Sequence, residues 1–276
     1  MQSSGDHISA ARNTSALPSA LEHADDIRKR VQQKRLAVFL DYDGTLTPIV
    51  ERPELAFLSA PMRRTLMELA SCCPVIIISG RDRTDVQQLV QLDNIFYAGS
   101  HGFDIVGPHG QQMTCERADE FLPTLARVEQ ELLQRLAYVE GAFVERKKFS
   151  IAVHVRGVTR DDEGKVEALV DHILVRYPDL RKSYGKKVFE LQPRLDWHKG
   201  KAVLWFLQAL QLDEAEGLPL YIGDDLTDED AFRTIADRGF GIVVETGTRP
   251  TAANYALKHP EEVHSFLRHL ISWLHC

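Results

Sequence analysis

The α/β fold of this chain is indicated by residues 36–45, Leu36-Ala-Val-Phe-Leu40-Asp41-Tyr-Asp43-Gly-Thr45. Its first five residues are all apolar, and they lead directly into two carboxylates. An unbroken apolar run is typical of a strand that is covered on both faces, as in a parallel sheet. Similar runs follow at 75–78, 95–98, 220–222 and 241–244, and helical patterns separate most of them. This alternation predicts an α/β core with a doubly wound, Rossmann-like parallel sheet.

The composition is that of an ordinary globular chain and excludes several classes of protein. Of the 276 residues, 44% are hydrophobic and 26% charged, which leaves enough apolar surface for a sizeable core. The net charge of −7 argues against nucleic acid or an anionic membrane as a partner. No apolar run could span a bilayer, and the first twenty residues lack the apolar core of a signal peptide. We therefore expect a cytoplasmic protein whose four cysteines are reduced thiols.

Three regions are expected along the chain. Residues 1–18 are polar and show no periodicity, which predicts a disordered N-terminal segment. Farther along, apolar and polar residues alternate from Phe149 to Arg156, as in an antiparallel strand with one covered face. Amphipathic helical patterns flank this strand. We predict an inserted α+β cap domain at 109–192, within a core domain made of 19–108 and 193–276.

Polar residues follow three of the predicted strands at their carboxyl ends, where open α/β sheets bind ligands. The carboxylates among them are Asp41, Asp43, Asp224, Asp225 and Asp228. So many like charges at one edge of a sheet require a cation, and ligand sets made of oxygen alone favour Mg²⁺.

These residue types suit phosphoryl transfer. A carboxylate held by a metal can attack a phosphoryl group and form an aspartyl-phosphate. A second carboxylate can protonate the leaving oxygen and then deprotonate water. Ser79, the Gly80 amide and Lys199 are placed to hold the phosphate oxygens and to neutralise their charge.

Each motif also has an ordinary structural explanation when it is taken alone. Asp-x-Asp-Gly after a strand can be a turn, Ser-Gly-Arg can end a strand, and Gly-Asp-Asp-x-x-Asp can begin an acidic helix. The three together, each after a buried strand, favour a functional site.

Asp41-Tyr-Asp-Gly-Thr45, Ser79, Lys199 and Gly223-Asp-Asp-Leu-Thr-Asp228 together resemble the four motifs of phosphatases of the haloacid dehalogenase (HAD) superfamily. The resemblance implies that Asp41 is the nucleophile and Asp43 the general acid/base. It further implies catalytic roles for Thr45, Ser79 and Lys199. Lys201 is the alternative to Lys199, although the Trp-His-Lys-Gly context favours Lys199.

The same resemblance implies Mg²⁺ as the cofactor. Asp41, the carbonyl of Asp43, and Asp224 would bind the ion, and Asp225 and Asp228 would ligate it or support its ligands. In the neighbouring Ser79-Gly-Arg81 segment, Gly80 and Arg81 are expected to bind the substrate.

From about residue 34 to residue 270 the chain resembles trehalose-6-phosphate phosphatases. Beyond the motifs above, the resemblance rests on Gly99-Ser-His-Gly102 and on the cap segment from Val144 to Arg156. It implies that the disaccharide is bound by Glu145, Lys147, Arg156 and Glu190. Such a face offers the donors and acceptors that sugar hydroxyls need, although the same residues could form a plain solvated surface.

Phe149 of the cap segment and Phe143, which directly precedes that segment, are expected in the cap core. The function implied by the resemblance is the hydrolysis of trehalose 6-phosphate to trehalose and phosphate, in trehalose biosynthesis. The alternatives are a HAD phosphatase for sucrose phosphate or mannosylglycerate phosphate, and a non-catalytic HAD-like regulatory module. The expected partner is a small sugar phosphate, with functional coupling to a trehalose-6-phosphate synthase and a monomeric state as further expectations.

Overall fold

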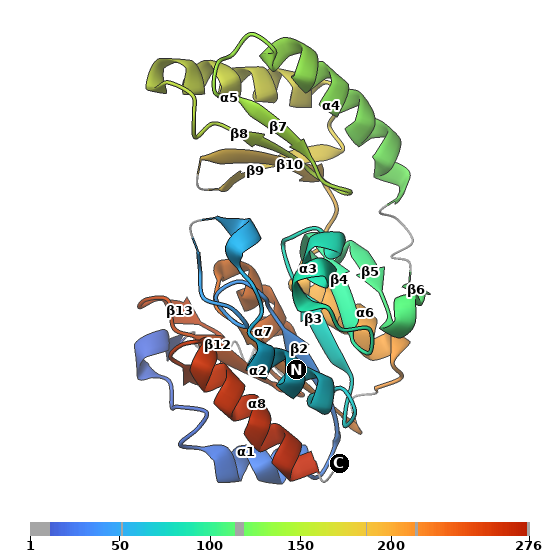
Figure 1. Ribbon diagram of the computed structural model, residues 1–276, viewed down its shortest axis with the longest axis vertical. Coiled ribbons are helices and arrows are strands. Elements are labelled where there is room, and N and C mark those ends of the chain that lie inside the picture. The colour runs from blue at the N-terminus through green and yellow to red at the C-terminus, as the bar shows by residue number, and fades with distance from the viewer. Residues whose placement is uncertain (1–11, 51, 114–118, 186, 213–214, 275–276) are drawn as a thin grey trace, which may run out of the picture. The chain divides into compact units, whose positions relative to one another are not determined.

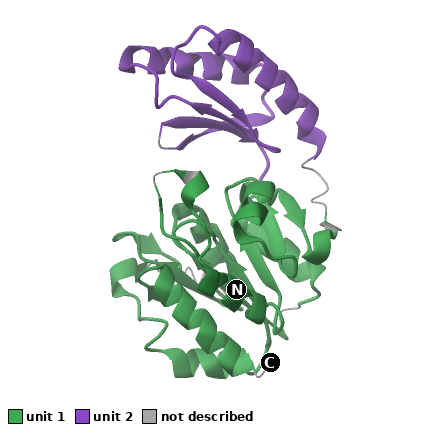
Figure 2. Ribbon diagram, viewed as in Figure 1, with its two compact units in different colours: residues 1–113, 197–276 green, residues 114–196 purple. Residues whose placement is uncertain are grey.

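The structure is a computed structural model that describes residues 12–50, 52–113, 119–185, 187–212 and 215–274. The chain forms two compact units, one of residues 1–113 and 197–276 and the other of residues 114–196 (Figure 2). The insertion was expected at 109–192. In the structure the second unit begins and ends a few residues farther along the chain, at 114 and 196.

The first unit is built on an eight-stranded sheet with the order β14-β12-β11-β2-β3-β4-β5-β6 (Figure 1). Neighbouring strands are parallel from β14 to β4, whereas β5 and β6 add an antiparallel edge. The predicted parallel α/β core is therefore confirmed, and the antiparallel edge is an addition to it. The strands are β2 (Arg35–Leu40), β3 (Val75–Ile78), β4 (Phe96–Gly99), β5 (Asp104–Val106), β6 (Gln112–Met113), β11 (Gly217–Gly223), β12 (Phe240–Val244) and β14 (Tyr255–Leu257).

Helices cover both faces of this sheet, because the side chains of each strand alternate between two cores. Leu36, Val38 and Leu40 of β2 enter one core, and Ala37 and Phe39 enter the other. The first core is closed by α1 (Ala24–Val31), α2 (Ala60–Leu69), α3 (Arg83–Val90) and α8 (Pro260–Leu274). The second is closed by α6 (Lys199–Ala209) and α7 (Glu229–Ile235).

Residues 12–18 of the N-terminal segment have a defined structure, which corrects the expectation of disorder for them. Its strand β1 (Arg12–Asn13) pairs antiparallel with β13 (Pro250–Thr251), and a 3₁₀ turn over Thr14–Ala16 follows. Thr14 is 1% exposed. The partners lie at the other end of the chain, so local composition carries no sign of them. The expectation for residues 1–11 lies outside the described residues.

The second unit is an antiparallel sheet with the order β7-β8-β10-β9 and two helices. Its elements are α4 (Leu122–Leu136), β7 (Phe143–Arg146), β8 (Ile151–His154), α5 (Arg160–Val175), β9 (Leu180–Gly185) and β10 (Val188–Pro193). Ile151 and Val153 pack with Leu132 of α4 and Val170 of α5 in one core. The predicted alternation of β8 therefore places its apolar residues against the helices.

Two further observations concern the helices and the cysteines. None of the described helices is long and apolar enough to cross a membrane. Cys73 is a buried free thiol, but Cys72 is disulfide-bonded, so the expectation of reduced thiols is wrong for Cys72.

Candidate active site

Two adjacent parallel strands bring the first carboxylates together. β2 and β11 pair in register, Leu40 opposite Ile222, so the residues that follow them meet at one edge of the sheet. The Asp41 amide donates to the carbonyl of Ile222 (2.9 Å), and Asp224 comes directly after β11. Asp41 and Asp224 are 5% and 4% exposed.

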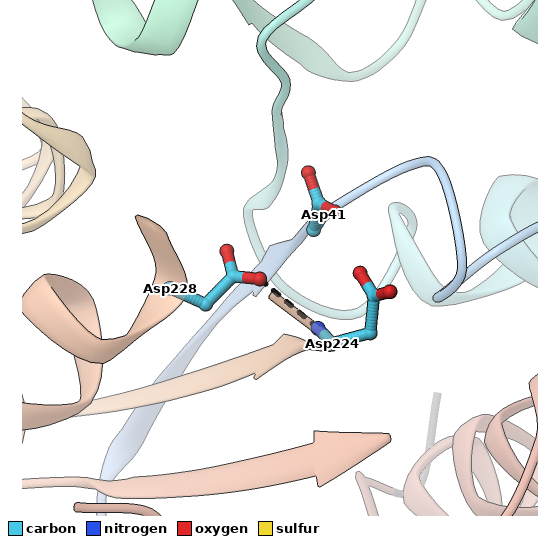
Figure 3. Close-up of side chains that lie close together, drawn as sticks. All are labelled: Asp41, Asp224 and Asp228. Carbon is cyan, nitrogen blue, oxygen red and sulfur yellow. Dashed lines mark hydrogen bonds between the residues drawn. The ribbon is translucent and has the colours of Figure 1, made fainter. Parts of the chain in front are cut away.

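Three buried carboxylates converge at this edge. One carboxylate oxygen from each of Asp41, Asp224 and Asp228 lies within 4.8 Å of the others (Figure 3). Burial raises the pKa of Asp41 well above that of an ordinary aspartate, against the opposing effect of Lys199. Burial and the charges of Asp228 and Asp225 raise the pKa of Asp224 to about 7. The cluster is therefore short of positive charge.

Lys199 supplies part of that charge. Its Nζ donates to Oδ1 of Asp41 (2.8 Å) and to Oδ1 of Asp228 (2.7 Å), and the side chain is 2% exposed. Burial alone would lower the pKa of Lys199, but the charges of Asp228 and Asp41 outweigh burial and raise it. Of the two lysines considered from the sequence, Lys199 is the one that lies among these carboxylates.

Asp228 organises the cluster, since both of its oxygens are fully used. Its Oδ1 accepts from Lys199 and from the Tyr221 hydroxyl (2.7 Å), and its Oδ2 accepts from the backbone amides of Asp224 (3.0 Å) and Asp225 (2.9 Å). Asp225 has an exposed side chain that caps the following 3₁₀ turn by accepting from the amide and hydroxyl of Thr227. These contacts favour a supporting role for Asp228 over direct ligation.

The remaining donor atoms fit Mg²⁺. Asp224 Oδ1 is buried and has no hydrogen-bond partner among the described residues, and the carboxylates of Asp41 and Asp224 lie close together. A set of carboxylate oxygens beside an unsatisfied acceptor is what a hard divalent cation requires.

Gly44 allows the turn after β2 to approach Asp224. Its φ is +80°, in the left-handed region, and a Cβ built there would lie 2.1 Å from Asp224 Oδ2. We predict that Gly44→Ala lowers turnover about a hundredfold, because the carboxylate must move by roughly 1 Å.

Gly110→Ala is the matched control for this prediction. Gly110 has a φ of +77°, and nothing lies within 4 Å of a Cβ built there. The Gly110→Ala variant therefore has the same backbone strain as Gly44→Ala, roughly 1–2 kcal/mol, but no clash with a neighbouring side chain. Phosphate release and thermal unfolding of both variants separate the two effects. Equal activities for the two variants would contradict the prediction.

Asp43 lies beside the cluster in a different environment. Its side chain is 40% exposed and accepts two hydrogen bonds from Arg81, from Nε to Oδ2 and from Nη2 to Oδ1, both 2.6 Å. Arg81 was expected to bind substrate; in the structure its guanidinium is paired with the expected acid/base residue.

Buried hydroxyls complete this edge. Ser79 is 2% exposed and its Oγ accepts from the Arg81 amide (3.1 Å), while Oγ1 of the fully buried Thr45 has no partner among the described residues. A Cβ on Gly80 would lie 2.8 Å from Cε1 of His101, so Gly80 brings the backbone close to that ring. His101 has a φ of +59° and its amide donates to the Ser79 carbonyl (2.8 Å). Its closeness to Gly80 was not predicted, because it depends on this turn.

A second polar cluster lies on the sheet face of the second unit that is turned away from its helices. Glu145 and Glu190 flank Ala152 across neighbouring strands, so the three share this face. Lys147 Nζ lies 3.3 Å from Glu190 Oε1, which also accepts from the Ser150 hydroxyl (2.7 Å). The structure thus brings three of the four predicted sugar-binding residues together. The fourth, Arg156, is exposed just after β8.

Two rings belong to the same face. His154 Nε2 lies 2.7 Å from Glu145 Oε2, and its ring centroid is 5.7 Å from that of Phe143. Phe143 is 62% exposed, which corrects its expected place in the cap core; it pairs with His154 on the open face of the sheet. Phe149 is 2% exposed, as expected for a core residue.

Comparisons with known proteins define first the class and then the family. The fold is shared with a haloacid dehalogenase-like hydrolase from Bacteroides thetaiotaomicron, at 16% identity and a TM-score of 0.60, over 85% of this chain and 99% of that one. This likeness shows the class of fold, an α/β core of the kind found in that hydrolase.

Within this class, the chain belongs to the trehalose-phosphatase family, whose family model matches residues 39–261. It is 44% identical to a probable trehalose-phosphate phosphatase 2 of Oryza sativa subsp. japonica, over 93% of this chain and 73% of the relative. A solved trehalose-6-phosphate phosphatase of Aspergillus fumigatus is 26% identical, with a TM-score of 0.66, over 93% of this chain and 99% of that one.

Proposed function

We propose that this chain hydrolyses trehalose 6-phosphate to trehalose and phosphate, with Asp41 as the nucleophile. The observation that carries the proposal is the placement of Asp41 in a chain of this family: it is buried, held by Lys199 and directed at the buried carboxylate of Asp224. Mg²⁺, held by Asp41, Asp224 and the Asp43 carbonyl, would supply Lewis-acid stabilisation of the phosphoryl oxygens.

The chemistry runs in two steps on the residues of the chain. A carboxylate oxygen of Asp41 forms a bond to phosphorus, the bond from phosphorus to the sugar oxygen breaks, and Asp43 gives that oxygen a proton. Asp43 then takes a proton from water as the water oxygen attacks phosphorus, which releases phosphate and restores Asp41. Lys199 keeps its charge throughout and orients the nucleophile, while Ser79 and Thr45 offer hydroxyls to the phosphoryl oxygens.

Arg81 would act in this scheme by positioning Asp43. Both oxygens of Asp43 are engaged by one guanidinium, so at least one of these hydrogen bonds must open before the carboxyl can reach the leaving oxygen. A phosphate dianion is a competing partner for the guanidinium. Substrate binding could in this way both use Arg81 and free Asp43.

The polar face of the second unit would select the sugar. It offers the carboxylates of Glu145 and Glu190 as acceptors and Lys147 as a donor, next to the exposed ring of Phe143. Sugar hydroxyls need both kinds of partner, and the apolar side of a sugar ring packs well on an aromatic ring.

We predict that Glu190→Gln lowers kcat/KM for trehalose 6-phosphate about tenfold to a hundredfold, because a charge-assisted hydrogen bond is lost. Turnover of p-nitrophenyl phosphate, which has no sugar, should change less than about threefold. The control is Glu167→Gln, which removes a carboxylate from α5 that contacts Lys182 and Tyr184 on the helix side of the sheet, and which should leave both activities unchanged. Parallel loss of both activities in Glu190→Gln would instead give the residue a structural role.

A panel of sugar phosphates tests the substrate itself. Trehalose 6-phosphate should be turned over faster than sucrose phosphate and mannosylglycerate phosphate, and a chelator should abolish release of phosphate. A preference for another sugar would leave the phosphatase chemistry in place and overturn the assigned substrate. Coupling to a synthase, the monomeric state and the cytoplasmic location stay predictions.

A further inference from the structure

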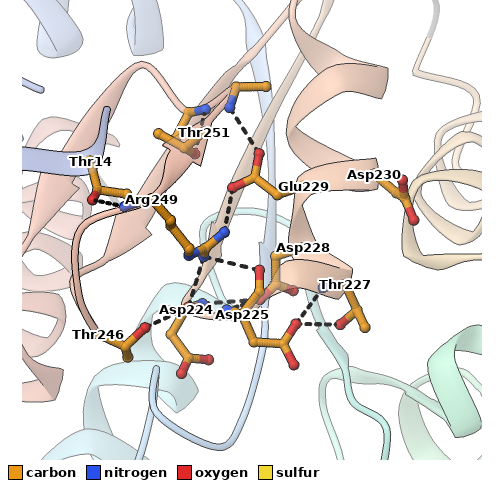
Figure 4. A network of polar contacts seen from close by, with 12 residues as sticks. Thr14, Asp224, Asp225, Thr227, Asp228, Glu229, Asp230, Thr246, Arg249 and Thr251 are labelled. Carbon is orange, nitrogen blue, oxygen red and sulfur yellow. Dashed lines mark hydrogen bonds and ion pairs between the residues drawn. The ribbon is translucent and has the colours of Figure 1, made fainter. Parts of the chain in front are cut away.

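Arg249, in the loop between β12 and β13, holds the backbone of the loop that carries Asp224. Its Nη2 donates to the carbonyls of Asp224 (2.8 Å) and Asp225 (3.1 Å) (Figure 4). The hydroxyl of Thr246, in the same loop as Arg249, also donates to the Asp224 carbonyl (3.1 Å). On its other side, the Asp224 amide donates to Asp228. The backbone amide and carbonyl of Asp224 are therefore both held by hydrogen bonds. These bonds fix the orientation of the backbone from which the Asp224 side chain extends.

The Arg249 guanidinium is itself held by a buried carboxylate. Nη1 donates to Glu229 Oε1 (2.8 Å), and the Glu229 side chain is 4% exposed. The second oxygen of Glu229 accepts from the amide of Ala252 (2.8 Å). The ion pair closes the loop across the start of α7 and so fixes the position of the Arg249 guanidinium.

The N-terminal segment fixes the backbone of Arg249. The Thr14 amide donates to the Arg249 carbonyl (2.9 Å), and the Arg249 amide donates to Thr14 Oγ1 (3.2 Å). The same hydroxyl donates to the Gly247 carbonyl (2.8 Å). Thr14 therefore joins both ends of the turn that presents Arg249, and the pairing of β1 with β13 continues this contact along the chain.

We propose that Arg249 is a positioning residue for Asp224 and that Thr14 of the N-terminal segment sets Arg249, so that this segment controls the affinity of the site for a divalent cation. The inference rests on the proposed metal site. Residues that orient a metal ligand without touching the metal typically change affinity by about tenfold to a hundredfold when they are replaced. In this chain such an effect would originate at the N-terminal segment, remote in sequence from the acidic motifs.

The test is a titration of the full chain with Mg²⁺ alone, followed by calorimetry and by the rise in unfolding temperature. Thr14→Val keeps the shape of the side chain but removes its hydroxyl, and should weaken Mg²⁺ binding about threefold to tenfold. Thr14→Ser restores the hydroxyl and should restore the affinity. Arg249→Lys keeps the charge but has one nitrogen in place of Nη1 and Nη2, which contact Glu229 and the two carbonyls from separate positions, and should weaken binding about tenfold or more.

A purely structural role for Thr14 gives a different result. Thr14→Val would then unfold at a lower temperature but bind Mg²⁺ as tightly as the parent chain, which would overturn the proposal. Should Thr14→Val fail to fold, the same comparison of unfolding temperature and Mg²⁺ affinity is made on Arg249→Lys, and unchanged affinity in that variant would overturn the proposal. Asp224→Asn tests the metal site separately from its control by Arg249 and Thr14. If the parent chain binds Mg²⁺ and Asp224→Asn binds it equally well, the metal site itself is misassigned.

Discussion

Replacing Asp41 with asparagine is expected to lower turnover by about four to six orders of magnitude while the protein stays folded. The amide keeps the shape of the side chain but cannot attack phosphorus. Lys199 retains its 2.7 Å contact with Asp228 in the variant, so its charge stays paired. Burial raises the pKa of the Asp41 carboxyl, and the charges of Asp228 and Asp224 add to this effect, so its replacement removes both a buried charge and a source of repulsion. We therefore expect a change in the free energy of unfolding of no more than about 1 kcal/mol.

Phosphate release and thermal unfolding, measured on the same preparation, check both parts of this prediction. Asp26→Asn is the matched control: Asp26 is exposed on α1 beside Lys29, and its replacement should alter neither quantity. Substantial hydrolysis by Asp41→Asn would rule out covalent catalysis by Asp41. Loss of folding would instead show that the carboxylate is required to neutralise Lys199.

The strands and the carboxylates at their ends could be predicted because both signals are local. Leu36–Leu40 is apolar throughout because both sheet faces are covered, and the run stops where Asp41 reaches the edge of the sheet. The role of Asp228 could not be predicted in the same way. Whether it binds a metal or serves other groups depends on Tyr221 and Lys199, which reach it from β11 and from α6.

The face of Phe143 could have been predicted from the sequence, because side chains two residues apart share one face of a strand. Phe143 and Glu145 are two residues apart on β7, so a Glu145 side chain on the open face requires Phe143 on the same face. The expectation of Phe143 in the core was inconsistent with this alternation. The N-terminal segment is the opposite case. Thr14 becomes buried through contacts with residues 247–249, and no periodicity near residue 14 indicates that pairing.

Asp43→Asn is expected to separate the two chemical steps. With trehalose 6-phosphate the variant should lose about 10²- to 10⁴-fold in turnover, because neither the sugar oxygen nor the attacking water has its proton donor or acceptor. An asparagine keeps one acceptor for Arg81, so the pair that orients residue 43 persists in part. The loss should therefore reflect proton transfer more than a collapse of this corner of the site.

The leaving group then distinguishes the two steps. Nitrophenolate needs no proton to depart, so p-nitrophenyl phosphate should still phosphorylate Asp41 in the variant, and hydrolysis of the phosphoenzyme should be slow for want of a base. Rapid-mixing measurements should show a burst of nitrophenol close to the amount of enzyme, and intact-protein mass spectrometry should show the added phosphoryl group. The double variant Asp41→Asn with Asp43→Asn is the control and should show neither signal. Equal loss on both substrates, without a burst or a phosphorylated species, would mean that Asp43 does not transfer the proton, and Arg81 would then be holding a carboxylate whose role is to shape the site.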